Sequence, residues 1–126
     1  MLIDLFTDKT GIALGRALDG LARRQKVIAN NIANAETPGF HRSEVNFESD
    51  LSAALATRPT AAAKKKLHEL KPTVQMDMQS PERPDGNNVN IDKEMADLTK
   101  TGLSYRAATT LLELKGSILR YVINGR

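Results

Sequence analysis

The chain has 126 residues but few large side chains from which to build an independent core. It contains no Trp and only five aromatic residues, which are Phe6, Phe40, Phe47, Tyr105 and Tyr121. The net charge of +3 comes from 18 basic and 15 acidic residues spread along the chain, so charge alone does not indicate nucleic acid. The absence of Cys excludes disulfides, thiolate catalysis and Cys-containing zinc sites, and it leaves the compartment open.

The first residues do not have the pattern of a targeting segment. Asp4 and Asp8 interrupt the apolar run that a secretory signal requires, and no later stretch has the length of a membrane span. We therefore expect neither a cleaved signal peptide nor a transmembrane segment.

Both terminal segments have the apolar periodicity of packed helices. In the first, spacings of four and three predict a helix that ends near Asn34. In the second, residues 91–123 carry a longer stripe, and a helix from Asp92 to Asn124 would be about 50 Å long. We predict a mainly α fold in which the two helices form an antiparallel coiled-coil-like hairpin. The predicted seam and subunit-packing residues are Leu18, Leu21, Ile28, Ile32, Met95, Leu98, Tyr105, Leu112, Leu119 and Ile123.

The C-terminal helix has a second apolar face, roughly opposite the first at 100° per residue. Its members are Leu103, Ala107, Leu111, Leu114, Ile118 and Val122. One partner helix within the chain can bury only one face, so the second face predicts an oligomer.

The segment between the helices has weaker signals. Residues 37–40 place Pro38 and Gly39 where a type II turn needs them, and Val45 and Phe47 indicate a short extended piece. Residues 48–84 suggest two short helices interrupted by Pro59, within an irregular, mobile connection rather than a second core. We divide the chain into an N-terminal helix (1–35), a flexible middle (36–90) and a C-terminal helix (91–126) whose first residue follows a cap at Asn90 or Asp92.

Two segments resemble a known family. Residues 28–40, Ile-Ala-Asn-Asn-Ile-Ala-Asn-Ala-Glu-Thr-Pro-Gly-Phe, resemble the N-terminal signature of the flagellar rod and hook family of axial proteins. Residues 85–106 are similar to the C-terminal block of the proximal rod members of that family. The signature residues, to which we assign an assembly role, are Asn30, Asn31, Asn34, Thr37, Pro38, Gly39 and Phe40.

The resemblance implies a structural subunit of the bacterial flagellar basal-body rod, a drive shaft that transmits torque, with no enzymatic activity, cofactor or metal. It implies export through the flagellar type III apparatus without a cleaved signal, and a periplasmic location in the rod. The implied partners are copies of the chain, other rod proteins, the base (MS) ring and rod-adaptor components, with no nucleic acid.

The signature asparagines have two interpretations, local capping and hydrogen bonding between subunits. We favour contacts between subunits for Asn30 and Asn31, whereas both interpretations stay open for Asn34 at the helix end.

Other chemistry has little support in the sequence. His41 and His68 lack a carboxylate at helical metal spacing, so we expect both to be solvated, and no nucleophile or phosphate-binding motif is present. The alternative function is a basic helical module that binds nucleic acid or an anionic membrane through Arg23, Arg24, Lys26 and the run at 64–66.

Overall fold

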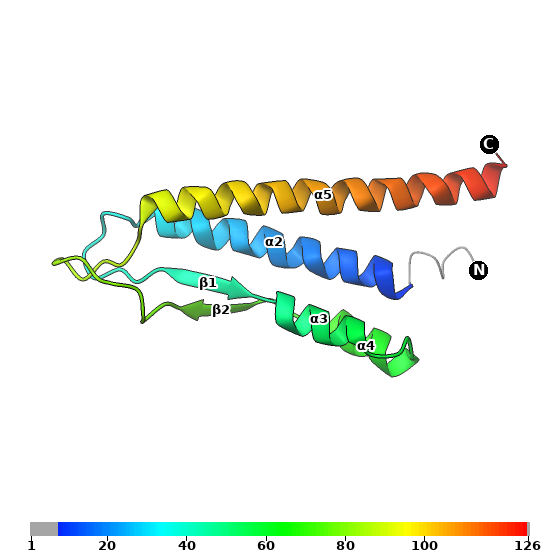
Figure 1. The fold of residues 1–126 in the computed structure, drawn as a ribbon, viewed down its shortest axis with the longest axis horizontal. Helices are drawn as coiled ribbons and strands as arrows, with labels where there is room; N and C mark the ends of the chain where they lie inside the picture. Colours follow the sequence, from blue (N-terminus) through cyan, green and yellow to red (C-terminus); the bar gives the residue numbers. More distant parts are fainter. Residues whose placement is uncertain (1–7, 126) are drawn as a thin grey trace.

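The computed structural model describes residues 8–125, which form four helices and a two-stranded sheet (Figure 1). In chain order the elements are α2 (Lys9–Ala33), β1 (Ser43–Asn46), α3 (Glu48–Ala56), α4 (Ala61–Glu69), β2 (Thr73–Met76) and α5 (Ile91–Asn124). The prediction of a mainly helical chain with two long terminal helices is confirmed.

The two long helices pack side by side and run in opposite directions. Contacts at both ends fix their relative register: Asn31 near the end of α2 bonds Glu94 in the first turn of α5, and Asp8 at the start of α2 pairs with Lys115. Helix α2 has 25 residues and α5 has 34. Because of this difference, α5 continues for more than two turns beyond Lys115, past the start of α2.

Side-chain and backbone caps define the helix ends. The Asp8 side chain accepts a bond from the Gly11 N–H at 2.7 Å, and the Asn90 side chain accepts one from the Lys93 N–H at 3.1 Å. Helix α2 ends at Ala33 with Asn34 as its C-terminal cap, as its periodicity predicts. Of the two predicted caps of α5, the structure uses Asn90.

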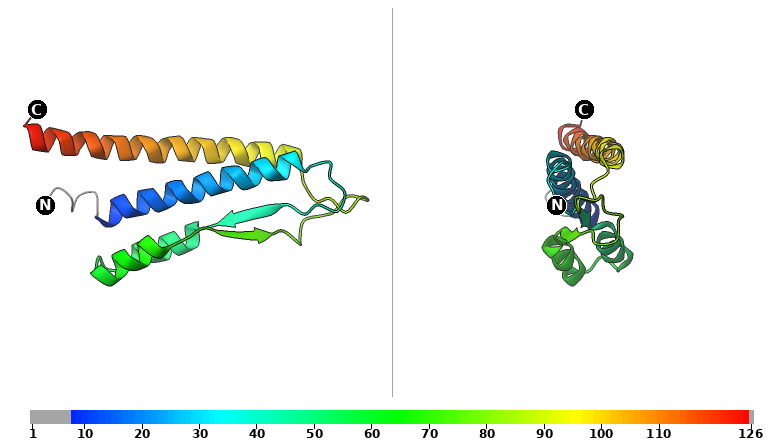
Figure 2. Two further views of the ribbon diagram at one scale, coloured as in Figure 1. Left: turned by 180° about the vertical axis from the view of Figure 1, so that it is seen from behind. Right: turned by 90° about the vertical axis from the view of Figure 1, so that its left-hand side faces the viewer.

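Helix α2 lies between α5 and a layer made by the sheet, α3 and α4, as two further views show (Figure 2). Strands β1 and β2 pair antiparallel, with Val45 opposite Val74 and Ser43 opposite Met76. The prediction of a short extended piece around Val45 is therefore confirmed, and this strand pairs with β2, which follows it in the chain after α3 and α4.

The middle segment is more regular than the sequence predicts. The two short helices are confirmed as α3 and α4, and a strand, β2, follows them. Pro72 lies immediately before β2, where its missing N–H removes no ladder bond. Buried Ala54 and Leu67 also pack with Ile12 and Ala13 of α2. The middle segment thus contributes a second small core, contrary to our expectation.

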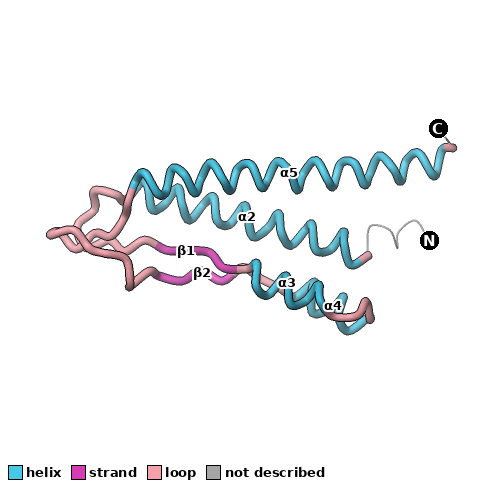
Figure 3. Tube along the Cα trace, viewed as in Figure 1, coloured by secondary structure: helices cyan, strands magenta, loops and turns pink. Residues whose placement is uncertain are grey.

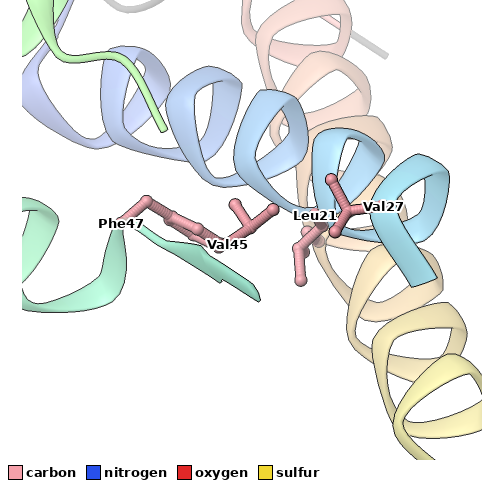
Figure 4. Close-up of a cluster of buried hydrophobic side chains, with 5 residues drawn as sticks. Leu21, Val27, Val45 and Phe47 are labelled. Atoms are coloured by element: carbon pink, nitrogen blue, oxygen red, sulfur yellow. The ribbon is translucent and has the colours of Figure 1, made fainter. Parts of the chain in front are cut away.

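The main core lies where β1 crosses α2 (Figure 4). One buried cluster contains Leu21 and Val27 of α2, Val45 of β1, Phe47 just before α3, and Ala108 of α5. This cluster joins all three layers of the chain. The loops that join α2 to β1 and β2 to α5 gather at one end of the molecule, and the other end consists of helices and the short connection between α3 and α4 (Figure 3).

Candidate assembly surfaces and the polar lock

The contact between α2 and α5 uses only part of the predicted seam. Leu21, Ile28 and Leu119 are buried, whereas Met95 and Ile123 are 49% and 55% exposed. The remaining predicted seam residues are half-buried: Leu18, Ile32, Leu98, Tyr105 and Leu112. The seam of this chain therefore covers neither Met95 nor Ile123.

The most buried line of α5 also lies slightly to one side of the predicted stripe. It consists of Leu119, which belongs to the predicted seam, and of Glu94, Thr101 and Ala108, which do not. A repeat of large apolar residues does not reveal these small and polar members. Gly102 still lies at the contact, since a Cβ there would be 3.8 Å from the Gln25 side chain.

The second apolar face of α5 is exposed. We call Leu103, Ala107, Leu111, Leu114, Ile118 and Val122 the apolar stripe, and its five large members are between 52% and 71% exposed. Five large aliphatic side chains exposed on one face of one helix are unusual for a protein surface, and exposed apolar surface of this extent is typical of interaction sites.

The signature turn forms as predicted. The Phe40 N–H donates to the Thr37 carbonyl at 3.2 Å, and Gly39 has a φ of 70°, which the third position of a type II turn requires. A second turn packs on it: Gly86 has a φ of 81°, and a Cβ there would be 3.3 Å from the Gly39 Cα. Both glycines are therefore required by conformation, and Gly86 also by space.

Asn87 joins the two segments that carry the family resemblance. Its fully buried amide donates to the carbonyls of Asn34 at 2.9 Å and Thr37 at 2.8 Å. The Gly39 N–H donates to the Asp85 carbonyl at 2.8 Å. Segments about 50 residues apart in the chain thus form one structural unit.

A buried polar network continues from this unit into both long helices. Arg42 Nε donates to Glu94 Oε1 at 2.6 Å, and Asn31 Nδ2 donates to Glu94 Oε2 at 3.0 Å. The Arg42 N–H donates to Asn88 Oδ1 at 2.7 Å. We call Asn31, Arg42, Asn87, Asn88 and Glu94 the polar lock; each is at most 4% exposed.

Asn31 has an intramolecular role, so our preference for a contact between subunits at this position is wrong. Its side-chain amide accepts from the Ser43 N–H at 3.0 Å and donates to the Ser43 carbonyl at 2.9 Å, as a neighbouring strand would. Asn34 donates to the Asn30 carbonyl at 2.8 Å and lies at the helix end, which favours capping. Asn30 is exposed, and an assembly role there stays a prediction.

The charges of the lock are mutually stabilised. Burial alone would lower the pKa of Arg42, but its bonds to Glu44, Glu94 and Asp77 raise that pKa above the ordinary arginine value. The Ser80 hydroxyl, together with the N–H groups of Gln79 and Ser80, holds the pKa of Asp77 well below its usual range. Both groups are therefore charged across the physiological pH range.

A close approach of β1 to α2 was not predicted. A Cβ on Gly20 would lie 2.6 Å from the Phe47 ring, so only glycine fits there. The Arg24 guanidinium lies over the same ring at 4.9 Å, pairs with Glu48 at 2.5 Å and donates to the Val45 carbonyl at 2.8 Å. The sequence signal available was a glycine inside a helical pattern.

A groove of about 490 Å³ opens between α2, β1 and the first half of α5. Leu21, Ile28 and Phe47 are among its apolar lining residues, and Glu48 and Lys100 are among its charged ones.

The structure also tests the remaining chemical predictions. His68 is exposed as expected, but His41 is not solvated: its side chain is 19% exposed and its Nε2 lies 3.5 Å from Glu82. Within residues 8–125, no cluster of three or more His, Asp or Glu side chains could hold a metal ion. None of the helices described here combines the length and hydropathy needed to cross a bilayer.

A long N-terminal helix that leads into the signature turn packs against a longer C-terminal helix with a surplus apolar face, an arrangement expected of a structural subunit that assembles, and sequence comparison gives the family. A family described as "Flagella basal body rod protein" matches residues 13–41, which cover most of α2 and the turn. The flagellar basal body rod protein FlgB of Borrelia hermsii is 37% identical over 110 residues, covering 76% of this chain and 82% of that protein.

Two further relatives have the same name. The FlgB proteins of Salmonella typhimurium and Escherichia coli are 32% and 31% identical over 115 residues, covering 79% of this chain and 83% of each relative. The chain belongs to the FlgB family of flagellar basal body rod proteins. It is a structural subunit of the basal-body rod, and the alternative of a nucleic-acid or membrane-binding module has no support among these relatives.

Proposed function

We propose that the chain builds the wall of the rod by packing the apolar stripe of α5 against neighbouring subunits. One observation carries this proposal: α2 covers one face of α5, while the five large stripe residues on the other face stay more than half exposed. A stable helix with two apolar faces needs a second covering.

The energetics favour many neighbours over one. Completing the burial of a half-exposed Leu or Ile contributes about 1 kcal/mol, so one stripe contributes on the order of 5 kcal/mol. Association of two molecules costs roughly 4–15 kcal/mol in lost freedom. A pairwise contact through the stripe is therefore weak, and a subunit with several neighbours is held firmly.

The proposal also includes how the helices pack and which neighbours the subunit has. The two long helices of each subunit would pack as an antiparallel coiled-coil-like hairpin, and the apolar contacts between subunits would let the rod transmit torque. The neighbours would be copies of this chain, other rod proteins, and base-ring and rod-adaptor components. The support is the family membership together with the unpartnered stripe.

We also propose a periplasmic rod position reached through the flagellar type III export apparatus. An exported chain must pass through a narrow channel unfolded, and a fold that depends partly on its neighbours for burial suits that route. The signature turn also serves assembly in this proposal, because it fixes the angle between α2 and β1. Its residues are Thr37, Pro38, Gly39 and Phe40.

Paired substitutions test the stripe. Leu111→Asp with Ile118→Asp places two charges in the stripe, and we expect loss of the chain from basal bodies isolated from a motile strain, and loss of swimming. The control is Thr110→Asp with Ser117→Asp, which adds the same charge at exposed neighbouring positions outside the stripe. Normal rod assembly by the stripe variant would overturn the proposal.

A further inference from the structure

The two edges of the small sheet differ in what lies beside them. Strand β1 lies between α2 and β2 (Figure 1). Side chains of α2 close the outer edge of β1: Asn31 bonds the N–H and the carbonyl of Ser43, and Arg24 donates to the Val45 carbonyl at 2.8 Å. The sheet has two strands, so within residues 8–125 no further strand lies along the outer edge of β2.

The register identifies the backbone groups that face this open edge. In an antiparallel pair, the N–H and C=O groups of successive residues point alternately toward the partner strand and away from it. The groups of Ser43 and Val45 bond α2 and therefore point away from β2. The residues opposite them, Met76 and Val74, point away from β1 for the same reason. Among residues 8–125, no group outside the sheet bonds the N–H or C=O of Val74 or Met76.

The same edge presents apolar side chains. Val74 lies opposite Val45, so both side chains are on the face of the sheet that meets the main core. Val74 is 39% exposed, and Met76 and Met78 are 61% and 67% exposed. Pro72 limits pairing to β2 and the residues after it, but β2 itself carries no charge, which is a common protection of an open edge.

A partner on this edge must bond the backbone as well as cover the side chains. N–H and C=O groups that lose water without gaining a hydrogen bond are costly, so a helix laid over Val74 and Met76 is unfavourable. An extended segment supplies an N–H and a carbonyl at alternate residues, in the geometry that an open strand requires. The edge therefore selects a strand.

A second copy of the chain is a poor source of that strand. Its β1 is not free to pair, because α2 closes the outer edge of β1. Its β2 can pair with the β2 of one other copy only, in a two-fold contact that closes with two subunits. A rod needs contacts that continue beyond two subunits, so this pairing does not extend it.

We propose that the outer edge of β2 accepts an extended segment of a different basal-body protein as the third strand of the sheet. The segment alternates apolar residues, which lie beside Val74 and Met76, with polar residues on the face of Thr73 and Gln75. This inference rests on the proposed function, since it takes the chain to be a rod subunit, and it adds the chemistry of one neighbour.

Hydrogen exchange of single amides tests the strand addition. In the purified full chain, the Gln75 amide faces β1 and should exchange slowly, whereas the Val74 and Met76 amides should exchange quickly. In basal bodies isolated from a motile strain, the Val74 and Met76 amides should exchange at least about tenfold more slowly. Equally fast exchange in basal bodies would overturn the proposal. Protection that appears in the purified chain as its concentration rises would assign the strand to a second copy and overturn the assignment to a different protein.

Met76→Pro separates backbone pairing from side-chain contact. It removes an outward N–H and leaves the bonds between β1 and β2, whereas the control Met76→Ala shortens the side chain and keeps the N–H. We expect Met76→Pro to lower the amount of the chain in isolated basal bodies about tenfold, and Met76→Ala to change it less than about twofold. Equal losses would indicate a side-chain contact and contradict strand addition, as would normal incorporation of Met76→Pro. Circular dichroism checks the fold of both variants, and if Met76→Pro does not fold, the exchange measurement on the natural chain decides.

The stripe variant Leu111→Asp with Ile118→Asp separates this inference from the proposed function. If the stripe variant loses rod assembly while Val74 and Met76 of the natural chain exchange quickly in basal bodies, the stripe proposal stands and strand addition fails. If the stripe variant assembles normally while these amides are protected in basal bodies, strand addition stands and the stripe proposal fails.

Discussion

The end of the molecule that holds the α2–β1 and β2–α5 connections and the opposite end, where α2 begins, are stabilised by different mixtures of contacts. At the first end, buried amides and charges bond across segments more than 45 residues apart, as Arg42 does with Asn88 and Glu94. At the opposite end, Leu67 of α4 packs with Ile12 and Ala13 of α2, and the ion pair of Asp8 with Lys115 is partly exposed. The charged contacts are therefore buried at one end and lie near the surface at the other.

A subunit that assembles needs both a fixed internal geometry and a surface that can pack against other molecules, and different contacts meet these two needs. A buried hydrogen bond or ion pair is favourable in one geometry and costly in others, so the polar lock fixes the register of α2, β1 and α5. An apolar surface is tolerant of small shifts, so the exposed part of α5 can adapt to a neighbour. The lock therefore restricts the geometry of the subunit, whereas the exposed apolar part of α5 tolerates small shifts.

Among single substitutions, we expect the largest loss of stability from removing Glu94. Glu94→Ala removes the carboxylate of α5 that bonds the buried Arg42 and Asn31 side chains, and we expect a loss of about 2–3 kcal/mol in unfolding free energy, since Glu44 and Asp77 still neutralise Arg42. Chemical denaturation followed by circular dichroism measures it.

Glu113→Ala is the matched control, since Glu113 is an exposed glutamate in the same helix. It should change the unfolding free energy by less than about 0.5 kcal/mol. A loss below about 1 kcal/mol for Glu94→Ala would mean that water replaces the lost carboxylate, and that the lock does not fix the register.

The next largest effect should come from the point where the sheet meets α2. Gly20→Ala would place a methyl group 2.6 Å from the Phe47 ring, and we expect destabilisation of about 1–3 kcal/mol from overpacking. Thermal unfolding of the purified chain provides the measurement.

Gly15→Ala, in the same helix, sharpens this test because nothing lies within 4 Å of its added Cβ. It should stabilise the chain by roughly 0.5–1 kcal/mol, since alanine is the better helix former. Equal effects at both positions would show that Phe47 moves aside freely.

The smallest expected effect concerns acid. The pKa of Asp77 is lower in the folded chain than in the unfolded chain, so its contribution to stability is complete above about pH 4 and is lost as the pH falls further. The stability advantage of the natural chain over Asp77→Asn should therefore shrink below about pH 4. Unfolding curves measured between neutral pH and about pH 3 test this; a constant difference would contradict it.

The sequence predicts the long helices well because their apolar residues repeat along one face over many turns. It also predicts the stripe, since its residues face away from the α2 contact, and the turn at Thr37, where Pro and Gly have fixed conformational preferences. These features depend on neighbours close in the chain.

The polar lock could not be predicted in the same way. Glu94 has the sequence context of an ordinary acidic residue in the first turn of a helix, and its partners Asn31 and Arg42 are 63 and 52 residues away. The packing of α4 was missed for a related reason: its buried side chain is the single Leu67 within an alanine- and lysine-rich segment. Only the tertiary arrangement reveals which polar residue is buried.

The pairing of the two chain ends has a consequence for the order of folding. Lys115 meets Asp8 across 107 residues, so a chain that emerges N-terminus first cannot complete its longest helical contact until nearly all of it has emerged. Contacts so distant in sequence form slowly, because the intervening chain must first be ordered. While the chain is being synthesised or exported, α2 therefore lacks its partner α5 for an interval. Complete subunits can associate with one another only after this interval ends.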